Sequence, residues 1–475
     1  MSLMPVLLWT DALIFFLVLV VVGAVFYARD KEHLTAPWRQ VMRSRMGVAS
    51  MLVLLVYVCI GLLDSMHFRK ALPNQVNVNE VSKAGEVHYS SEVLSVLDVL
   101  MGSIKTKVET TYSAPFATHA FAREMVQLPD GQQLRIYPRL KYGGAHLDNP
   151  ETDRFADIAS SSVLAVLLGL FAWLVFASLL VAWLAKRQSV SFNEMLASML
   201  KGRTDIPWRV LLLTLGIVIV LLCWFALLGP KYHILGTDKV GQDVFYLSMK
   251  SVRTGLMIGT LTTLVMLPFA IMLGIMAGYL RGWVDDVVQY LYTTLSSIPG
   301  VLLIAAAVLM LQVYIANHPE MFETDAARAD MRLLFLIVIL GITSWTGLCR
   351  ILRGEAMKLR EMDYIEAAVA FGVGKGKIIT RHILPNVMHI VMITVVLDFS
   401  GLVLAEAVLS YVGVGVDPSM HSWGNMINGA RLEMAREPMV WWSLLAAFIF
   451  MFVLVLAANL FSDAVRDAFD PRLRK

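Results

Sequence analysis

Long apolar stretches alternate with polar segments along the whole chain. The apolar stretches are residues 11–27, 47–63, 159–185, 209–229, 253–279, 286–312, 332–350, 390–412 and 440–461. Each is close to or above the ~17–25 residues that a helix needs to cross the hydrocarbon layer of a bilayer. The pattern therefore predicts an all-α polytopic membrane protein with nine spanning helices.

The first stretch has the position of a signal peptide but not its flanking charges. A signal peptide carries basic residues before its apolar region and small residues at a cleavage site. Here Asp11 stands at the start of the stretch, and the basic residues, beginning with Arg29 and Lys31, come after it. We expect a retained transmembrane helix.

Basic residues gather in alternate polar segments, which predicts the orientation. The enriched segments are 28–46, 186–208, 280–285, 351–389 and the carboxyl-terminal tail. Cytoplasmic loops carry an excess of Lys and Arg. We therefore expect the amino terminus outside and the carboxyl terminus in the cytoplasm, in a bacterial inner membrane.

One polar segment, residues 64–158, is long enough to fold on its own. Apolar residues from Val93 to Ile104 recur at helical spacing and predict an amphipathic helix. Val126 to Ile136 predicts two short strands around the turn Pro129-Asp130-Gly131. We expect a small α+β insert on the periplasmic side.

Composition agrees with a membrane protein. The chain is 57% hydrophobic and 16% charged, whereas soluble domains have about 25% charged residues. The net charge of +3 gives no reason to expect nucleic-acid binding. Cys59, Cys223 and Cys349 lie in or at the end of apolar stretches without CxxC spacing, so we expect packing roles and no metal site.

The largest predicted cytoplasmic loop, 351–389, has the pattern of a helix, a turn and a second helix. Residues 363–370 are rich in helix formers, and the glycines that follow, beginning with Gly372, favour a tight turn. Residues 377–383 predict a second short helix, which Pro385 should end before the next span. On spacing alone, an ordinary amphipathic loop on the membrane surface is the alternative.

The order Glu366-Ala367-Ala368, Gly372 and Leu384-Pro385 resembles the EAA loop of type I ABC importer permeases. In that family the loop is a coupling helix that docks in a groove of a separate ATPase. The resemblance implies the following coupling residues: Asp363, Glu366, Ala367, Ala368, Gly372, His382, Leu384 and Pro385. The family pattern often has Ile where this chain has His382.

Further motifs resemble the dipeptide/oligopeptide branch of these permeases. The loop before the fifth span carries Gly236, Thr237, Asp238, Gly241 and Asp243. The stretch EAVLSYVGVG, residues 406–415, and the tail from residue 463 are also similar to that branch. Gln242 departs from the branch, which commonly has Arg there. The resemblance covers about residues 209–475.

The branch usually has six spans, so this chain carries about three more. We expect the following divisions: two amino-terminal helices in 1–63, the insert in 64–158, two further helices in 159–229, a permease core in 253–461 with the coupling loop 351–389, and a cytoplasmic tail in 462–475. The resemblance implies a second homologous permease, two ABC ATPase subunits, a periplasmic substrate-binding protein and membrane lipid as partners. It also implies a short peptide as substrate; nickel chelates or another small solute remain open.

No catalytic motif is present in the sequence. Residues 371–377 (FGVGKGK) are rich in glycine and lysine, but a P-loop needs GxxxxGK[ST], and this stretch fails at both ends. ATP and Mg²⁺ should therefore be bound by partner subunits, with no cofactor in this chain. Because neither HExxH nor GxSxG occurs, a membrane enzyme is disfavoured. A scaffold that keeps the permease fold stays an alternative.

Two carboxylates, Asp398 and Glu406, lie within the eighth apolar stretch. A carboxylate in a membrane helix usually faces protein or water. Both could line the translocation path, or each could form a buried hydrogen bond to a neighbouring helix. In the fifth stretch, the glycine pairs 255/259 and 274/278 could permit close helix contact.

Overall fold

A computed structural model describes residues 3–71, 89–127, 133–322 and 324–469. Within these ranges, nine helices are long and apolar enough to cross a membrane. They are α1 (Trp9–Ala28), α3 (Arg45–Ser65), α6 (Pro150–Gln188), α8 (Trp208–Leu228), α9 (Val244–Leu280), α11 (Gly300–Asn317), α12 (Asp325–Arg360), α15 (Leu384–Tyr411) and α17 (Trp442–Phe469). The eighth span also includes the turns that lead into α15, from Lys375. The predicted all-α membrane fold is confirmed.

Shorter elements connect these helices. The short helices are α2 (Glu32–Arg43), α4 (Val96–Leu100), α5 (Gly102–Lys105), α7 (Phe192–Lys201), α10 (Trp283–Ser297), α13 (Asp363–Ala370), α14 (Lys375–Ile378) and α16 (Trp423–Glu433). The strands are β1 (Leu3–Val6), β2 (His67–Lys70), β3 (Leu94–Ser95), β4 (Glu124–Gln127) and β5 (Gln133–Ile136). A 3-10 turn occupies Pro319–Met321, and a π-helical turn occupies Ile379–Ile383.

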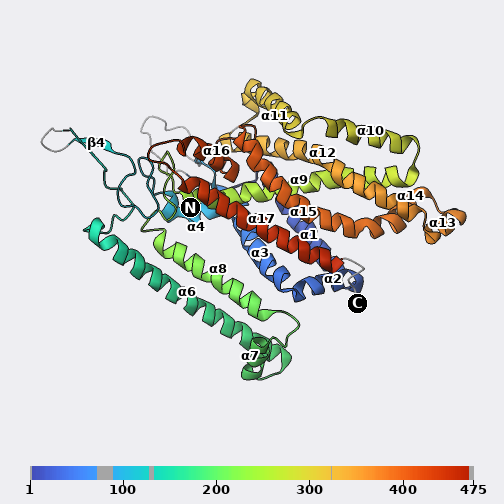
Figure 1. The fold of residues 1–475 in the computed structure, drawn as a ribbon, viewed down its shortest axis with the longest axis horizontal. Coiled ribbons are helices and arrows are strands. Elements are labelled where there is room, and N and C mark those ends of the chain that lie inside the picture. The colour runs from blue at the N-terminus through green and yellow to red at the C-terminus, as the bar shows by residue number, and fades with distance from the viewer. Residues whose placement is uncertain (1–2, 72–88, 128–132, 323, 470–475) are drawn as a thin grey trace, which may run out of the picture.

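The long helices α9 and α12 lie side by side at the centre of the permease core (Figure 1). A Cβ atom added at Gly274 would lie 2.8 Å from the carbonyl oxygen of Cys349, and one at Gly278 would lie 2.4 Å from that of Arg353. Only glycine fits where two backbones approach this closely. The expected role of this glycine pair in close helix contact is confirmed, and α15 and α17 pack against the same core.

One predicted span is wrong in its position. The apolar stretch 286–312 is not a single helix, because α10 ends at Ser297 and α11 begins at Gly300. Pro299 lies at the break, and Ile298 before it is extended (φ −89°, ψ 131°), the conformation that a following proline favours. The spanning helix here is α11, while α10 runs back along α9.

The insert is built around two small antiparallel sheets. β2 pairs with β1 from the amino terminus and with β3, and β4 pairs with β5. The predicted hairpin strands are therefore confirmed, while their turn at 129–131 lies outside the described residues. The predicted amphipathic helix over 93–104 is wrong in extent, because the segment forms β3 and the two short helices α4 and α5.

The core helices have two distinct ends (Figure 1). The end of α9 at Leu280 lies near α13 and α14, and we call it the coupling end. The end of α9 at Val244 lies near the insert and α16, and we call it the insert end. The amino terminus is near the insert end, and the carboxyl terminus is at the opposite side of the molecule.

Candidate functional site

The loop at the coupling end begins with α13, whose bounds match the predicted helix 363–370. Gly372 follows with φ +72°, so the turn adopts the left-handed conformation that glycine allows. Its N–H donates to the carbonyl of Val369, and the N–H of Val373 donates to that of Ala368. These bonds satisfy carbonyls at the end of α13 and fix the direction in which the chain leaves it.

The second half of the loop corrects the prediction. Pro385 does not end a separate short helix; it lies in the first turn of α15, where no intrahelical N–H is needed. The π-helical turn Ile379–Ile383 directly precedes α15, so α14, this turn and α15 follow one another without an intervening loop. The chain after Gly374 is therefore attached directly to a membrane helix.

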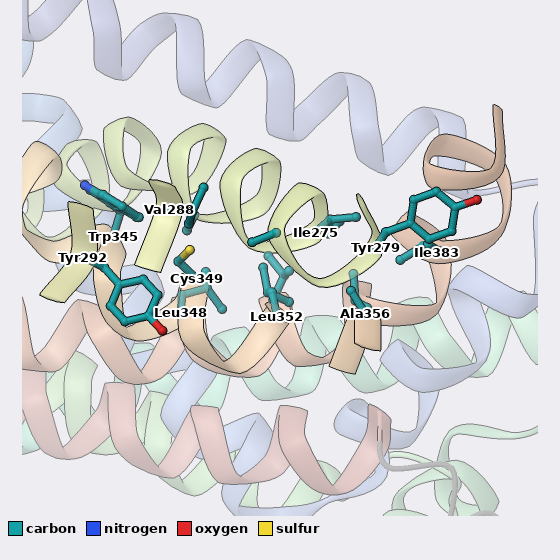
Figure 2. Close-up of a cluster of buried hydrophobic side chains, with 14 of the residues drawn as sticks. Ile275, Tyr279, Val288, Tyr292, Trp345, Leu348, Cys349, Leu352, Ala356 and Ile383 are labelled. Carbon is teal, nitrogen blue, oxygen red and sulfur yellow. The ribbon is translucent and has the colours of Figure 1, made fainter. Parts of the chain in front are cut away.

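Three buried isoleucines anchor the loop to the core. Ile365, Ile378 and Ile383 are at most 1% exposed and belong to one apolar cluster with side chains of α9 and α12. Figure 2 shows Ile383 beside Tyr279, with Ile275, Leu352 and Ala356 farther along the facing helices. Because close-packed interiors transmit displacement, α13 and its turn are expected to move with these helices as one body.

Polar contacts add to this attachment. Arg353 forms a two-point ion pair with Asp285 of α10, at 2.5 and 2.7 Å. Arg360, the last residue of α12, donates to the carbonyl of Tyr279 at 3.1 Å. Arg281 pairs with Glu361 at 2.7 Å across the two helix ends. The ends of α9, α10 and α12 are thus fixed relative to one another directly beneath α13.

The outward face of α13 and its turn is exposed and partly apolar. Asp363, Glu366, Ala367 and Gly372 are all exposed, whereas Ala368 is half-buried. The Phe371 side chain is 87% exposed. Val369, Met362 and Tyr364 are exposed as well. Sequence reasoning used Phe371 only to reject a P-loop; its place just before a left-handed glycine is the signal that could have identified it as a projecting side chain.

The remaining coupling residues lie at the start of α15 and in the π-helical turn before it. Leu384 and His382 are half-buried, and the ring of His382 lies 6.4 Å from that of Tyr364. Asn386 donates to the Tyr364 hydroxyl at 3.1 Å and to the His382 carbonyl at 2.7 Å. These contacts join α13 to α15, so the structure brings the predicted coupling residues together in one surface element.

The motif residues 236–243 lie at the insert end, covered by the insert. The Thr237 hydroxyl accepts from the Ser113 N–H at 2.6 Å and donates to the Thr111 carbonyl at 2.9 Å. A Cβ atom at Gly241 would lie 1.9 Å from the carbonyl oxygen of Glu109. Asp243 caps α9 by accepting from the Phe245 N–H at 2.8 Å. The motif therefore joins the insert to the start of α9.

A buried charged cluster reinforces this joint. His233 contacts Asp243 at 2.7 Å and Glu109 at 3.4 Å, and Glu109 also accepts three backbone N–H groups from residues 141–143. Burial alone would lower the pKa of His233, but its hydrogen bonds to Asp243 and Glu109 raise that pKa to about 9. Burial alone would raise the pKa of Glu109, but His233 and the backbone amides lower it to about 2. The imidazolium of His233 and the carboxylate of Glu109 are thereby kept charged near neutral pH.

The two carboxylates of α15 have different surroundings. Glu406 is 1% exposed and accepts a 2.7 Å hydrogen bond from Ser410. Asp398 is half-buried, and no hydrogen bond or ion pair joins it to another described residue. The Ser410 bond lies within α15, but Glu406 also has hydrogen bonds with the Ser422 side chain and the Gly424 backbone at the start of α16, as the interpretation of a buried hydrogen bond to a neighbouring helix expects. Asp398 is the one of the two carboxylates that keeps no such partner among the described residues.

No group of three or more His, Cys, Asp and Glu side chains that could hold a metal ion is found among the described residues. The coupling end presents a helix tip with one projecting aromatic side chain and an acidic, alanine-rich face.

Comparison with known proteins identifies the core. Residues 270–475 match the family described as binding-protein-dependent transport system inner membrane component. The chain is 32% identical over 249 residues to a glutathione transport system permease protein of Pectobacterium atrosepticum, covering 52% of this chain and 75% of that protein. It is 32% identical over 251 residues to an oligopeptide transport system permease protein of Mycobacterium tuberculosis, covering 52% and 80%.

A third relative, the dipeptide transport system permease protein of Bacillus subtilis, is 27% identical over 243 residues, covering 51% of this chain and 70% of that protein. Residues 1–269, with the insert and the first helices, lie outside the family match. The chain belongs to the family of binding-protein-dependent transport inner-membrane components, as a type I ABC importer permease of the dipeptide/oligopeptide branch.

Proposed function

We propose that this chain forms half of the translocation path of an ATP-driven importer for short peptides and connects that path to a separate ATPase through residues 363–383. The observation that carries the proposal is the exposed tip of α13, which is anchored to three membrane helices by buried isoleucines. Phe371 is the most exposed large hydrophobic side chain among the described residues, and aromatic side chains are enriched at protein interfaces.

The proposed mechanism is a rigid-body transfer of motion. The ATPase chains bind ATP and Mg²⁺ and close on each other, and each carries a docked α13 with it. Because Ile365, Ile378 and Ile383 pack between α9, α12 and α15, displacement of α13 moves those helices together. The two permease subunits then open the path toward the opposite side, and hydrolysis resets them.

The partners and the orientation belong to the same proposal. We expect a second related permease, two ATPase subunits and a substrate-binding protein that delivers the peptide at the insert end. The coupling end then faces the cytoplasm, with the carboxyl terminus, while the insert and the amino terminus face the periplasm. The names of the relatives, each a permease protein of a transport system, support the partners, and the basic residues of segments 28–46 and 351–389 support the orientation.

The substrate class rests on the relatives and on Asp398. The relatives are named for dipeptide, oligopeptide and glutathione transport, and each of those molecules carries a free amino group. A half-buried carboxylate in a membrane helix, with no hydrogen bond or ion pair to the part of the chain that the structure describes, is suited to meet such a cation. We therefore propose Asp398, rather than Glu406, as the path residue.

Hydrolysis by the purified assembly tests the coupling. With all partners present in lipid, Phe371→Ser should lower substrate-stimulated ATP hydrolysis about tenfold, which corresponds to the loss of about 1.4 kcal/mol. Leu200→Ser on α7 is the matched control, because Leu200 is 62% exposed and far from α13 (Figure 1). Unchanged hydrolysis and stimulation in Phe371→Ser would refute the proposal.

A further inference from the structure

An apolar groove of about 330 Å³ lies between α1, α3 and α9. Its walls include Val18, Val21 and Val22 of α1, Val58 and Gly61 of α3, and Met257 of α9. Apart from Ser65, Thr260 and Arg253, every lining residue is aliphatic, Met or Gly. The groove therefore has the surface of a hydrocarbon-binding site.

The three polar lining residues each have a hydrogen-bond partner within the protein. The Ser65 hydroxyl donates to the Gly61 carbonyl at 2.9 Å, and that of Thr260 donates to the Leu256 carbonyl at 2.6 Å. Arg253 donates to Asp11 at 2.6 Å. Water needs two to four polar partners to occupy a cavity, and apart from the Arg253 guanidinium at one end the walls of this groove are almost entirely apolar. The body of the groove therefore favours an apolar occupant.

The size of the groove selects among apolar occupants. Its wall on α1 runs from Ile14 to Val22, which at 1.5 Å per residue is about 12 Å. A helix of this length and about 10 Å diameter would occupy on the order of 900 Å³. That is well above the 330 Å³ present. A single acyl chain is slender enough, and all three walls belong to membrane-spanning helices.

The end of the groove at Ser65 and Arg253 adjoins the basic strand β2, which has the sequence His67-Phe68-Arg69-Lys70. His67 contacts Asp11 at 2.7 Å, and Asp11 in turn contacts Arg253 of the groove wall. Arg69 lies two residues further on and thus on the same face of β2 as His67. Its Nε is buried and has no hydrogen-bond partner among the described residues.

We propose that this groove holds an acyl chain of one anionic phospholipid, whose phosphate binds Arg69 and Lys70. Guanidinium groups bind phosphate oxygens in two-point geometry, and Arg69 is half-buried while Lys70 is exposed, so both side chains can offer positive charge to a headgroup at this end of the groove. The lipid fills the space between α1 and α3, so the additional amino-terminal helix is joined to the core partly by lipid. This site is independent of the transport function proposed above.

Native mass spectrometry of the detergent-solubilised full chain tests the site, with phosphatidylglycerol as the anionic probe and phosphatidylcholine as the neutral one. Lipid from the general annulus is lost on delipidation, whereas one phosphatidylglycerol per chain should persist. Val21→Trp, which fills the groove from α1, should lower the retained lipid about tenfold. Leu19→Trp is the matched control, because Leu19 is 69% exposed and does not line the groove.

The headgroup part of the proposal has its own variant. Arg69→Gln should still retain a lipid but lose most of the preference for phosphatidylglycerol; Lys70→Gln, at an exposed position, gives the same readout if Arg69→Gln does not fold. Equal retention by Val21→Trp and Leu19→Trp would overturn the acyl site. An unchanged preference in both charge variants would overturn the phosphate site. A phospholipid with a diazirine in its acyl chain should label the groove walls. Labelling spread evenly over all exposed helices would also overturn the acyl site.

Discussion

The two ends of α9 are held by different kinds of interaction. At the coupling end, Gly274 and Gly278 bring α9 against α12, and an apolar cluster secures the loop. The Arg281–Glu361 ion pair there is open to solvent, with side chains 41% and 68% exposed. Exposed ion pairs of this kind contribute little. The coupling end is therefore stabilised by close packing together with the two-point Arg353–Asp285 ion pair, and the exposed pair adds little.

At the insert end, buried charges join the core to the additional segments. Arg253 pairs with Asp11 of α1, Lys250 pairs with Asp64 of α3 and with Asp98 of the insert, and His233 joins Asp243 to Glu109. The side chains of Arg253 and Asp11 are only 7% and 0% exposed. Losing one partner of such a pair leaves a buried charge without compensation. These clusters therefore fix the positions of α1, α3 and the insert relative to α9.

The largest expected effect follows from breaking the cluster around Arg253. Arg253→Met leaves Asp11 and Asp330 buried without their cation, which should lower the free energy of unfolding by about 3–5 kcal/mol. Denaturation of the purified chain in detergent measures this. Adding Asp11→Asn to Arg253→Met should restore part of the loss, since one uncompensated charge is removed. A variant as stable as the wild type would contradict the claim that charge holds the insert end.

An intermediate effect is expected from separating α9 and α12. Gly278→Ala places a methyl group where the Arg353 carbonyl lies 2.4 Å away, which should cost about 1–3 kcal/mol of stability and reduce coupled hydrolysis. Gly354→Ala on α12 is the control, because nothing lies within 4 Å of its Cβ position. That variant should be neutral or gain up to about 1 kcal/mol. Equal changes in stability for Gly278→Ala and Gly354→Ala would contradict the claim that close contact between α9 and α12 stabilises the coupling end.

A pH-dependent effect is expected from the buried charged cluster around His233. Folding raises the pKa of His233 from 6.5 to about 9. The contribution of His233 to the free energy of unfolding is therefore complete below pH 6.5 and is lost as the pH rises through about 9. Folding lowers the pKa of Glu109 from 4.5 to about 2. The contribution of Glu109 to the free energy of unfolding is therefore complete above pH 4.5 and is lost as the pH falls through about 2. Stability from this cluster should therefore be greatest between pH 4.5 and 6.5.

Melting curves of wild type and His233→Gln between pH 6 and 9 measure this contribution. The wild type should lose stability across that range, and the variant should start lower and lose less. Parallel curves would show that His233 does not titrate with folding.

The sequence predicts local features of the coupling end well. The bounds of α13 follow from its helix formers and from the glycines after Ala370, which act within a few residues. The break at Ile298–Pro299 was missed because the apolar pattern continues through it, although the proline was a local signal. The projecting side chain of Phe371 was missed because its exposure depends on the geometry of the turn.

The insert end is different, because its contacts join residues far apart along the chain. Asp11 and Arg253 are separated by 242 positions, and His233 and Glu109 by 124. No periodicity or spacing links such pairs. The motif at 236–243 could be recognised by resemblance, but its burial beneath the insert depends on segments that the family match does not cover.

Protection of Phe371 tests the central claim most directly. Phe371→Cys is labelled with a maleimide in the purified chain alone and in the assembly with its ATPase partner, and the labelled peptide is quantified by mass spectrometry. Leu200→Cys, also at an exposed position, serves as the control. We predict that the partner slows labelling at 371 at least about tenfold and leaves labelling at 200 unchanged, as a buried interface anchor requires. Equal labelling of residue 371 with and without the ATPase would contradict the assignment of α13 as the coupling contact.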